Sequence, residues 1–593
     1  MWRGEGVTLG HRRLAILDLS EAGRQPMSDS SGRLHITFSG EIFNFVELQR
    51  ELAAMGHIFR SGTDTEVILA AFDQWGEGCL GRFNGFWAFG IWDARDRTLF
   101  LARDRLGKKP LFYAQPSGVE FAFASEMKAL TPLLDAVLPN LGLLKDQHRI
   151  FTYEGSPDCL IDGLKRFPAG SCGWYRGGRL TIRRWWSTLD SLIRVPDTYQ
   201  EQVELVRETF LDACRIRMRS DVPIGTALSG GLDSSATISS MVQVADSRPG
   251  NRGASDWRHA FVASFPGTSL DEAPFARRVC EHLGIPLEVI RIDPAAAAGR
   301  MLDYCYLFEE SYITSPIPFM LTYAAVKEHG ISVTLDGHGA DEIFGGYPFD
   351  FIFALGDAGM NFRNLNNVLD AYFDAIPPGP EFGKPRVRSL FALQWMAKDR
   401  LKRIVRRGAK WSGRDSGHHS WARLDNLSKR LYISTHETVL PTLLRNYDRY
   451  GMANGVEIRM PFLDHRMVSL AFSLPWTSKI RRGFSKAIVR DAVAPFLPND
   501  IAYRKTKIGF NSPFLDWMRG SLRQFMYDTI ASRSFLECDL IDSRRVAKEV
   551  RKAISSEKKG DFNYGQQVWM MVAPYFWEQG FLLRVQREAR DLA

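Results

Sequence analysis

An apolar segment that runs straight into a glycine-rich loop constrains the fold most strongly. Ile224 to Leu228 is typical of a buried strand, Ser229 to Ser235 (SGGLDSS) follows at once, and a helix-forming segment begins at Ala236. Paired glycines let a backbone approach an anion closely, while serine hydroxyls and the free N–H groups of a helix start donate to it. This order predicts a phosphate-binding site in an α/β domain. The alternative is a helix cap on an ordinary turn.

A carboxylate inside this loop points to a cation. Asp233 would repel a bound phosphate unless a divalent cation lay between them, so we interpret it as a magnesium ligand. A second loop, Asp336 to Tyr347, follows the apolar segment Ile331 to Leu335. Because ligands bind at the carboxyl ends of parallel strands, both loops can face one nucleotide, with Asp341 as a second carboxylate and Glu342 beside it. The alternative is a glycine-rich turn with solvated acids.

The length and the pattern of elements predict two domains. A chain of 593 residues exceeds what one core supports. Strand-rich sequence with two amphipathic helices predicts a layered α+β domain over residues 1–190. Over residues 200–593, strands alternate with helices and then give way to mostly helical sequence, which predicts a parallel-sheet α/β domain with a helical C-terminal part. Its expected strands are 224–228, 260–265, 287–292 and 331–335.

The composition alone does not indicate which class of partner the protein binds, so that inference depends on the motifs. The chain has 76 Lys or Arg against 68 Asp or Glu, and its densest basic stretch, Lys384 to Arg414, is interpreted as a solvated helix face rather than a polyanion or membrane-surface patch. The seven cysteines show no metal spacing, the first residues do not have the pattern expected of a signal peptide, and no apolar run is long enough to span a bilayer. We expect a cytoplasmic enzyme that acts on small molecules and has no membrane or nucleic-acid partner. A homodimer is compatible with the sequence.

Three further motifs accompany the two loops: Asp448 to Ala453, Val456 to Asp464 and Arg504 to Phe510. Over nearly its whole length the chain resembles the asparagine synthetase B family, and its glycine loop is similar to the PP-loop of ATP pyrophosphatases. The resemblance implies adenylation of a carboxylate by ATP and its transfer to ammonia, with aspartate giving asparagine as the leading reaction. Alternatives are the same chemistry on another carboxylate, such as a surface-sugar precursor or a peptide, and a PP-loop enzyme that modifies RNA.

The resemblance also implies ATP and Mg²⁺ as cofactors and assigns residues to them. Asp233 and Asp341 would hold Mg²⁺, and Lys507 occupies the family's catalytic lysine position, where an ammonium stabilises charge that builds on the α-phosphate. Glu342 and His338 complete the catalytic set, although better-known members carry glutamate at His338. Residues that would bind ATP and pyrophosphate are Ala227, Leu228, Ser229, Gly230, Gly231, Leu232, Ser234, Ser235, Ala263, Asp336 and Gly337. Surface charge for Lys507 and apolar core for the aliphatic residues are the alternatives.

Residues 1–190 resemble a class II glutamine amidotransferase of the N-terminal nucleophile type. The residues that match its glutamine-binding positions are Arg13, Ser39, Gly40, Glu41 and Asp64. Two features depart from the family: no cysteine precedes Cys79, and Ser39 stands where asparagine is usual. We therefore expect no glutaminase activity from this sequence. Of two explanations, a truncated start and a chain restricted to free ammonia, we favour the first.

Overall fold

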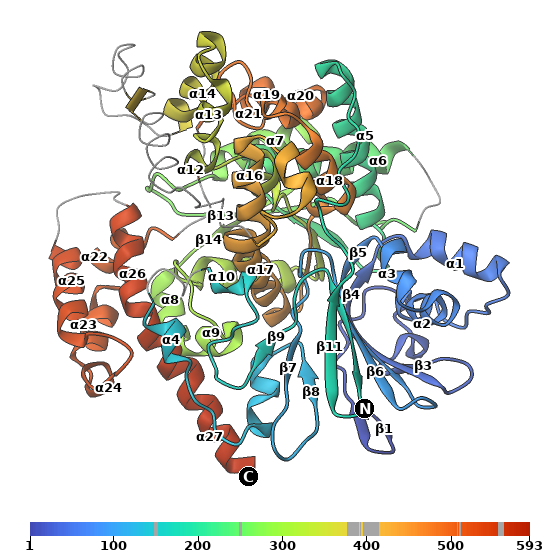
Figure 1. The fold of residues 1–593 in the computed structure, drawn as a ribbon. Helices are drawn as coiled ribbons and strands as arrows, with labels where there is room; N and C mark the ends of the chain where they lie inside the picture. Colours follow the sequence, from blue (N-terminus) through green and yellow to red (C-terminus); the bar gives the residue numbers. More distant parts are fainter. Residues whose placement is uncertain are drawn as a thin grey trace.

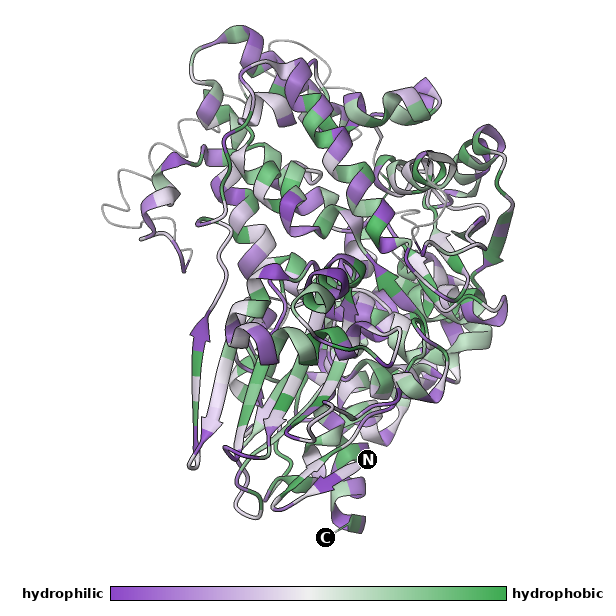
Figure 2. Ribbon diagram, turned by 90° about the vertical axis from the view of Figure 1, so that its right-hand side faces the viewer, coloured by the Kyte–Doolittle hydropathy of each residue, from purple (hydrophilic) through white to green (hydrophobic). Residues whose placement is uncertain are grey.

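The computed structural model describes residues 1–146, 152–247, 252–375, 391, 393–394, 414–506, 508, 512–555 and 562–592. Two sheets with their helices lie side by side, and both termini lie at the same end of the molecule (Figure 1). Hydrophobic residues concentrate in the interior strands and helices, whereas hydrophilic residues predominate on the outer helices (Figure 2). Most of the stretch Lys384 to Arg414 lies outside the described residues, so its interpretation stays a prediction.

The N-terminal part is layered, as predicted. In spatial order its larger, antiparallel sheet contains β11 (Arg179–Arg184), β10 (Ser171–Arg176), β6 (Thr98–Arg103), β5 (Gly85–Asp93), β4 (Leu34–Ile42) and β3 (Met27–Ser28). On one face, Trp87 and Phe89 pack against helices α1 (Phe45–Ala54) and α2 (Asp64–Trp75). On the other, Ala88 contacts the apolar layer of a small sheet, whose strands are β8 (Ala122–Ala124), β7 (Phe112–Ala114) and β9 (Lys165–Arg166).

The C-terminal end of the chain covers the small sheet. Trp577, Phe581 and Val585, the last of these on α27 (Leu583–Leu592), share a buried cluster with Phe112 and Ala114 of β7. In Figure 1 this helix runs along the N-terminal part beside α4 (Leu141–Leu144). A helical layer of the N-terminal part is therefore supplied by residues far away in the sequence.

The second sheet is parallel and has five strands. Its spatial order is β14 (Leu287–Arg291), β13 (His259–Ser264), β12 (Ile224–Ala227), β15 (Val333–Leu335) and β16 (Glu457–Arg459). The four predicted strands are confirmed. Strand β16 is an addition that the sequence did not predict, because its one apolar residue, Ile458, stands between the charged residues Glu457 and Arg459. The strand order reverses between β12 and β15, which is where ligands bind in open parallel sheets.

Helices account for most of the described chain after Gly345, as predicted. The helices that matter below are α6 (Leu232–Ser247), α10 (Ile317–Glu328), α11 (Ala340–Phe344), α14 (Phe362–Ala375), α17 (Leu440–Ala453) and α20 (Ala487–Val493). Within the described ranges, none of the helices has the length and hydrophobicity needed to cross a membrane.

Buried polar contacts join the two parts. Lys108 and Lys109 of the N-terminal part place their ammonium groups 3.2 and 3.0 Å from Asp448 of α17, and all three side chains are at least 95% buried. Asn84 donates to Asp464 across the same boundary at 2.9 Å. Charges removed from water require such partners. Two of the motif segments that carried the family resemblance thus serve the contact between the parts.

Candidate active site

The glycine-rich loop connects β12 to α6, as predicted, although the helix begins at Leu232 rather than at Ala236. Gly230 has a φ of 67°, and a Cβ there would lie 2.4 Å from the backbone nitrogen of Ala276, so both conformation and packing require glycine. The backbone N–H of Gly231 donates to Ser229 Oγ at 3.1 Å, and the Ser229 and Ser234 hydroxyls are 3.0 Å apart. The loop therefore turns tightly into the first turn of α6, whose N-terminal N–H groups and dipole favour an anion.

A cavity of about 520 Å³ lies in front of both loops. The predicted residues on its wall are Ala227, Leu228, Ser229, Gly231, Leu232, Asp233, Ser234, Ala263, Gly337, His338, Asp341 and Glu342. Phe261 and Val262 of β13 extend the apolar part of this wall beside Ala227 and Ala263. The two loops are thus brought to one space, with an apolar wall at the ends of β12 and β13.

Three predicted residues lie beside the cavity but not on its wall: Gly230, Ser235 and Asp336. The Asp336 carboxylate is fully buried and accepts hydrogen bonds from the Ala227 backbone N–H at 2.9 Å and the Tyr323 hydroxyl at 2.7 Å. Burial raises its pKa to about 6 despite these donors. Asp336 therefore ties β15 to β12 and α10, a positioning contact rather than an open ligand group.

Lys486 lies between the two carboxylates that were predicted to bind a metal. Its Nζ is 2.7 Å from both carboxylate oxygens of Asp233 and 2.7 Å from Oδ1 of Asp341. Burial opposes its charge, but the two carboxylates outweigh that effect and raise the pKa of Lys486. The loops touch because Gly337 has no side chain: a Cβ there would lie 2.3 Å from the Asp233 carbonyl carbon. Asp233 and Asp341 therefore converge on one cation position.

His338 lies on the cavity wall with 26% of its side chain exposed. Its ring stacks on Tyr447 of α17 with centroids 3.5 Å apart. Burial and then the nearby Lys108 ammonium lower the pKa of His338, so the imidazole is neutral at pH 7. Asp336 Oδ2 lies 3.7 Å from its Nε2, beyond hydrogen-bond distance. A neutral histidine here offers a hydrogen bond and an aromatic face, not a positive charge.

Glu342 forms a buried contact with a residue that the sequence did not single out. The Tyr347 hydroxyl donates to Glu342 Oε1 at 2.7 Å, and both residues line the cavity. Burial and the neighbouring Glu342 carboxylate raise the pKa of Tyr347, which keeps its phenol protonated. This pair places an oriented carboxylate and a phenol beside Asp341.

The predicted catalytic lysine, Lys507, lies outside the described residues. Its described neighbours Lys505, Thr506 and Ile508 line the cavity. Lys505 places its Nζ 2.7 Å from Asp374 of α14. The assignment of Lys507 stays a prediction.

The predicted glutamine-binding residues contact the protein itself. The Arg13 guanidinium donates to the backbone carbonyls of Leu17 and Asp18 at 2.7 and 2.6 Å. Glu41 and Asp64 are buried together beside Arg459 of β16, whose guanidinium lies 3.4 Å from Glu41. Burial raises the pKa of both carboxyls, that of Asp64 to about 7. This acidic pair suits a ligand ammonium group.

Ser39 and Gly40 lie on β4 immediately before this acidic pair. Gly40 has a φ of 138°, and a Cβ there would lie 2.0 Å from the Phe86 carbonyl oxygen. Glycine is therefore required where β4 approaches β5. The seven cysteines are buried, and burial raises the pKa of Cys79 well above its ordinary value. No cysteine thiol of this sequence matches an exposed nucleophile.

Comparison with known proteins settles the family. Residues 205–581 match the family model described as asparagine synthase, and residues 1–186 match a glutamine amidotransferase domain. The chain belongs to the asparagine synthase family. A Bacillus subtilis relative named asparagine synthetase [glutamine-hydrolyzing] 3 is 31% identical, over 85% of this chain and 80% of its own. A second from that organism, asparagine synthetase [glutamine-hydrolyzing] 1, is 28% identical over 89% and 83%. Amidase chyE of Penicillium rubens is 26% identical over 93% and 88%.

Two site residues of this asparagine synthase family member escaped the sequence analysis. Lys486 is a single lysine before the short apolar helix α20, with no loop motif around it. Tyr347 closes the second loop, but its hydroxyl could be placed only once the turn after α11 was known.

Proposed function

We propose that this chain forms an amide from a carboxylic acid and ammonia at the expense of ATP, through an acyl-adenylate. A carboxylate oxygen bonds to the α-phosphorus, the bond from that phosphorus to the bridging oxygen breaks, and pyrophosphate leaves. Ammonia then attacks the acyl carbon, AMP leaves with the bonding electrons, and the surplus proton passes to solvent. The family resemblance and the names of the relatives make aspartate the first acid to test.

One observation carries the proposal: the convergence of Asp233 and Asp341, from loops at the ends of two neighbouring parallel strands, on the ammonium of Lys486 at 2.7 Å. Two carboxylates with one cation position beside a glycine-rich helix start fit a metal-bound polyphosphate. Within the described residues no cluster of three or more His, Cys, Asp or Glu side chains could hold a metal unaided. A phosphate oxygen would complete the coordination.

The residues divide the work by their chemistry. Asp233 and Asp341 would hold Mg²⁺, which when bound neutralises charge on the departing pyrophosphate. Ser229 and Ser234, with the N-terminal turn of α6, would bind the phosphates. Lys486 would turn from the carboxylates to the phosphate oxygens, and Lys507 is proposed to stabilise the charge at the α-phosphate.

We propose that the nitrogen reaches the acyl-adenylate as ammonia. The acidic pair Glu41 and Asp64 retains the chemistry of a glutamine-amine site, but the sequence has no cysteine before Cys79. The relatives named glutamine-hydrolyzing support a glutamine-dependent ligase in general. For this sequence we expect ammonium salts to support amide formation, and glutamine to support neither amide formation nor glutamate release.

Exchange of labelled pyrophosphate into ATP tests the proposal. Purified chain is incubated with ATP, Mg²⁺ and each of a panel of carboxylic acids, without ammonia. Exchange that depends on an acid, and that Asp233→Asn reduces at least about 100-fold, is expected because the variant weakens charge stabilisation at the phosphates. Exchange independent of every acid, or equal in the variant, would contradict the proposal.

A further inference from the structure

Helix α17 separates the catalytic cavity from the contact between the two parts of the chain. Asp448 and Arg449 point to the N-terminal part: Asp448 pairs with the two lysines described above, and the Arg449 guanidinium donates to the Ser125 carbonyl at 2.8 Å. The opposite stripe, at helical spacing, contains Leu440, Leu443, Leu444, Tyr447 and Tyr450, and every one of these lines the cavity. One helix thus places its charges on one side and an apolar wall on the other.

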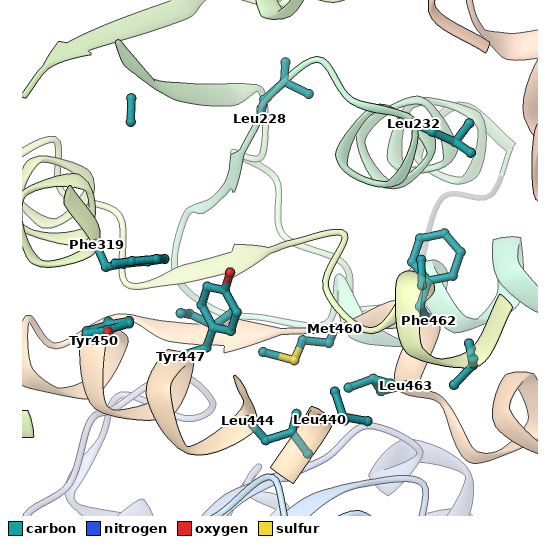
Figure 3. Close-up of a cluster of buried hydrophobic side chains, with 14 of the residues drawn as sticks. Leu228, Leu232, Phe319, Leu440, Leu444, Tyr447, Tyr450, Met460, Phe462 and Leu463 are labelled. Atoms are coloured by element: carbon teal, nitrogen blue, oxygen red, sulfur yellow. The ribbon is translucent and has the colours of Figure 1, made fainter. Parts of the chain in front are cut away.

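This wall is aromatic over much of its surface. Tyr450 is stacked between Phe308 and Phe319, with ring centroids 5.0 and 4.6 Å apart, and Tyr447 meets Phe319 edge-on at 6.1 Å. His338 continues the array against Tyr447. Figure 3 shows Tyr447 and Tyr450 on α17 with Phe319 beside them, and the Tyr447 hydroxyl pointing to the side on which Leu228 lies. His338, which the family resemblance assigns to the catalytic set, lies against this wall, so the wall borders the position proposed for the acyl group.

The positively charged side chains that line the cavity within the described residues do not lie on the α17 wall. They are Lys486, Arg490, Arg504 and Lys505, which come from one segment after α17. Lys486 contacts the phosphate-side carboxylates, and Arg490 donates to the backbone carbonyls of Ala502 and Arg504 at 2.7 and 2.9 Å. Arg504 approaches Glu272 at 3.8 Å, and Lys505 contacts Asp374. Among the lining residues in the fully described segments 312–323 and 439–460, none is charged.

We infer that the site takes a carboxylic acid with an apolar body of aromatic size, in preference to aspartate. This inference rests on the proposed function, since it names the acid that is adenylated. Free aspartate would bring an ammonium and a second carboxylate against the α17 wall, and a charge that leaves water without a partner is strongly disfavoured. An aromatic body instead stacks on Tyr447 and Phe319 and removes apolar surface from water.

One uncharged group on the wall sets the remaining specificity. The hydroxyl of Tyr450 is buried and finds no hydrogen-bond partner within the described part of the chain. Buried polar groups in proteins are nearly always partnered, so an unpartnered hydroxyl on a ligand wall points to a ligand that supplies the bond. A hydroxyl or ether on the aromatic body would satisfy it without adding charge.

Binding of two adenylate mimics tests the inference. Phenylacetyl-sulfamoyl adenosine and aspartyl-sulfamoyl adenosine are titrated into the full chain by calorimetry, with sulfamoyl adenosine as the reference. We expect the phenylacetyl mimic to bind about 100-fold tighter than the aspartyl mimic. Equal or tighter binding of the aspartyl mimic overturns the inference and leaves the proposed function standing. If neither mimic binds more tightly than the reference, there is no acyl site here and the proposed function falls with it.

A charge placed on the wall gives a second readout. Leu443 is partly exposed on α17, so Leu443→Lys adds a cation without removing a fully buried side chain. The variant is expected to lower the preference for the phenylacetyl mimic at least about tenfold, because the new ammonium pairs with the aspartyl carboxylate. Leu443→Met, which keeps size and neutrality, should leave the preference unchanged. An identical preference in the Lys and Met variants would contradict the inference.

Discussion

The variant Lys486→Met tests the cation position of the active site through the stability of the fold, which is measured without substrate and does not depend on catalysis. In the wild type one ammonium lies 2.7 Å from the carboxylates of both Asp233 and Asp341. Methionine keeps most of the side-chain volume but removes the charge. The two carboxylates then face one another across the position that Lys486 occupied, and their repulsion destabilises the contact between the two loops.

The size of the effect follows from burial. Removing one partner of a fully buried ion pair costs about 3–5 kcal/mol. Asp233 and Asp341 retain 21% and 17% side-chain exposure, so water screens part of the repulsion. We expect a loss of about 2–3 kcal/mol in the free energy of unfolding. If the carboxylates bind Mg²⁺ in place of the ammonium, Mg²⁺ at 100 times its Kd returns about 2.7 kcal/mol, which offsets the loss.

Urea unfolding followed by tryptophan fluorescence, with and without MgCl₂ and without nucleotide, measures both effects. Lys505→Met is the matched control: Lys505 has 48% side-chain exposure and pairs with Asp374, so the substitution should cost about 0–1 kcal/mol. A Lys486→Met midpoint that falls in buffer and recovers with Mg²⁺, with little change in the control, is the expected result. A variant as stable as the wild type, or one whose unfolding midpoint does not change with Mg²⁺, would refute the shared cation position.

Three further predictions follow from the described contacts. Asp448→Asn should cost about 3–5 kcal/mol in urea unfolding, because it leaves the Lys108 and Lys109 ammonium groups buried without their carboxylate; exposed Asp96→Asn should cost nothing measurable. Although burial opposes ionisation, Lys109 and then Lys108 lower the pKa of Asp448 from 3.8 to about 2. The contact of Asp448 with the two lysines therefore stabilises the fold by about 2 kcal/mol above pH 4. As the pH falls from 4 to 2, acid titration should show this contribution being lost in the wild type but not in Asp448→Asn. The lowered pKa of His338 keeps the imidazole neutral between pH 5 and 8, so His338→Gln should leave the shape of the pH profile of pyrophosphate exchange unchanged over this range. A change in rate with pH near 6.5 that is present in the wild type and absent from the variant would show that His338 titrates there.

Local sequence signals were sufficient to predict the structure where one short motif determines both the local fold and the proposed chemistry. The glycine loop, its strand and its helix lie where the pattern placed them, since each depends on residues that are adjacent in the chain. Asp341 was predicted from the same logic at a second strand end. The strand β16 was missed because its one apolar residue, Ile458, lies between two charged residues. The helical layer over the small sheet was missed because Val585 is more than 450 residues from β7 in the sequence.

The sequence did not show contacts with distant partners. The carboxylate of Asp336, which was predicted to bind nucleotide, accepts hydrogen bonds from Ala227 and Tyr323, and its role in nucleotide binding stays a prediction. Lys486 had no local motif, and only the convergence of two loops gives it a role. The Arg13 guanidinium, which was predicted to hold a glutamine carboxylate, donates to the turn at Leu17 and Asp18, and its role in glutamine binding stays a prediction.

Adenylation is tested most directly by the products formed from ATP. Purified chain is supplied with ATP, Mg²⁺, ammonium chloride and an acid that supports exchange, and the nucleotide products are separated by chromatography. We predict AMP and pyrophosphate in equal amounts, matched by amide and reduced at least about 100-fold by Asp233→Asn. Acid-dependent formation of ADP and inorganic phosphate would contradict it, because the bond at the α-phosphorus would then be intact.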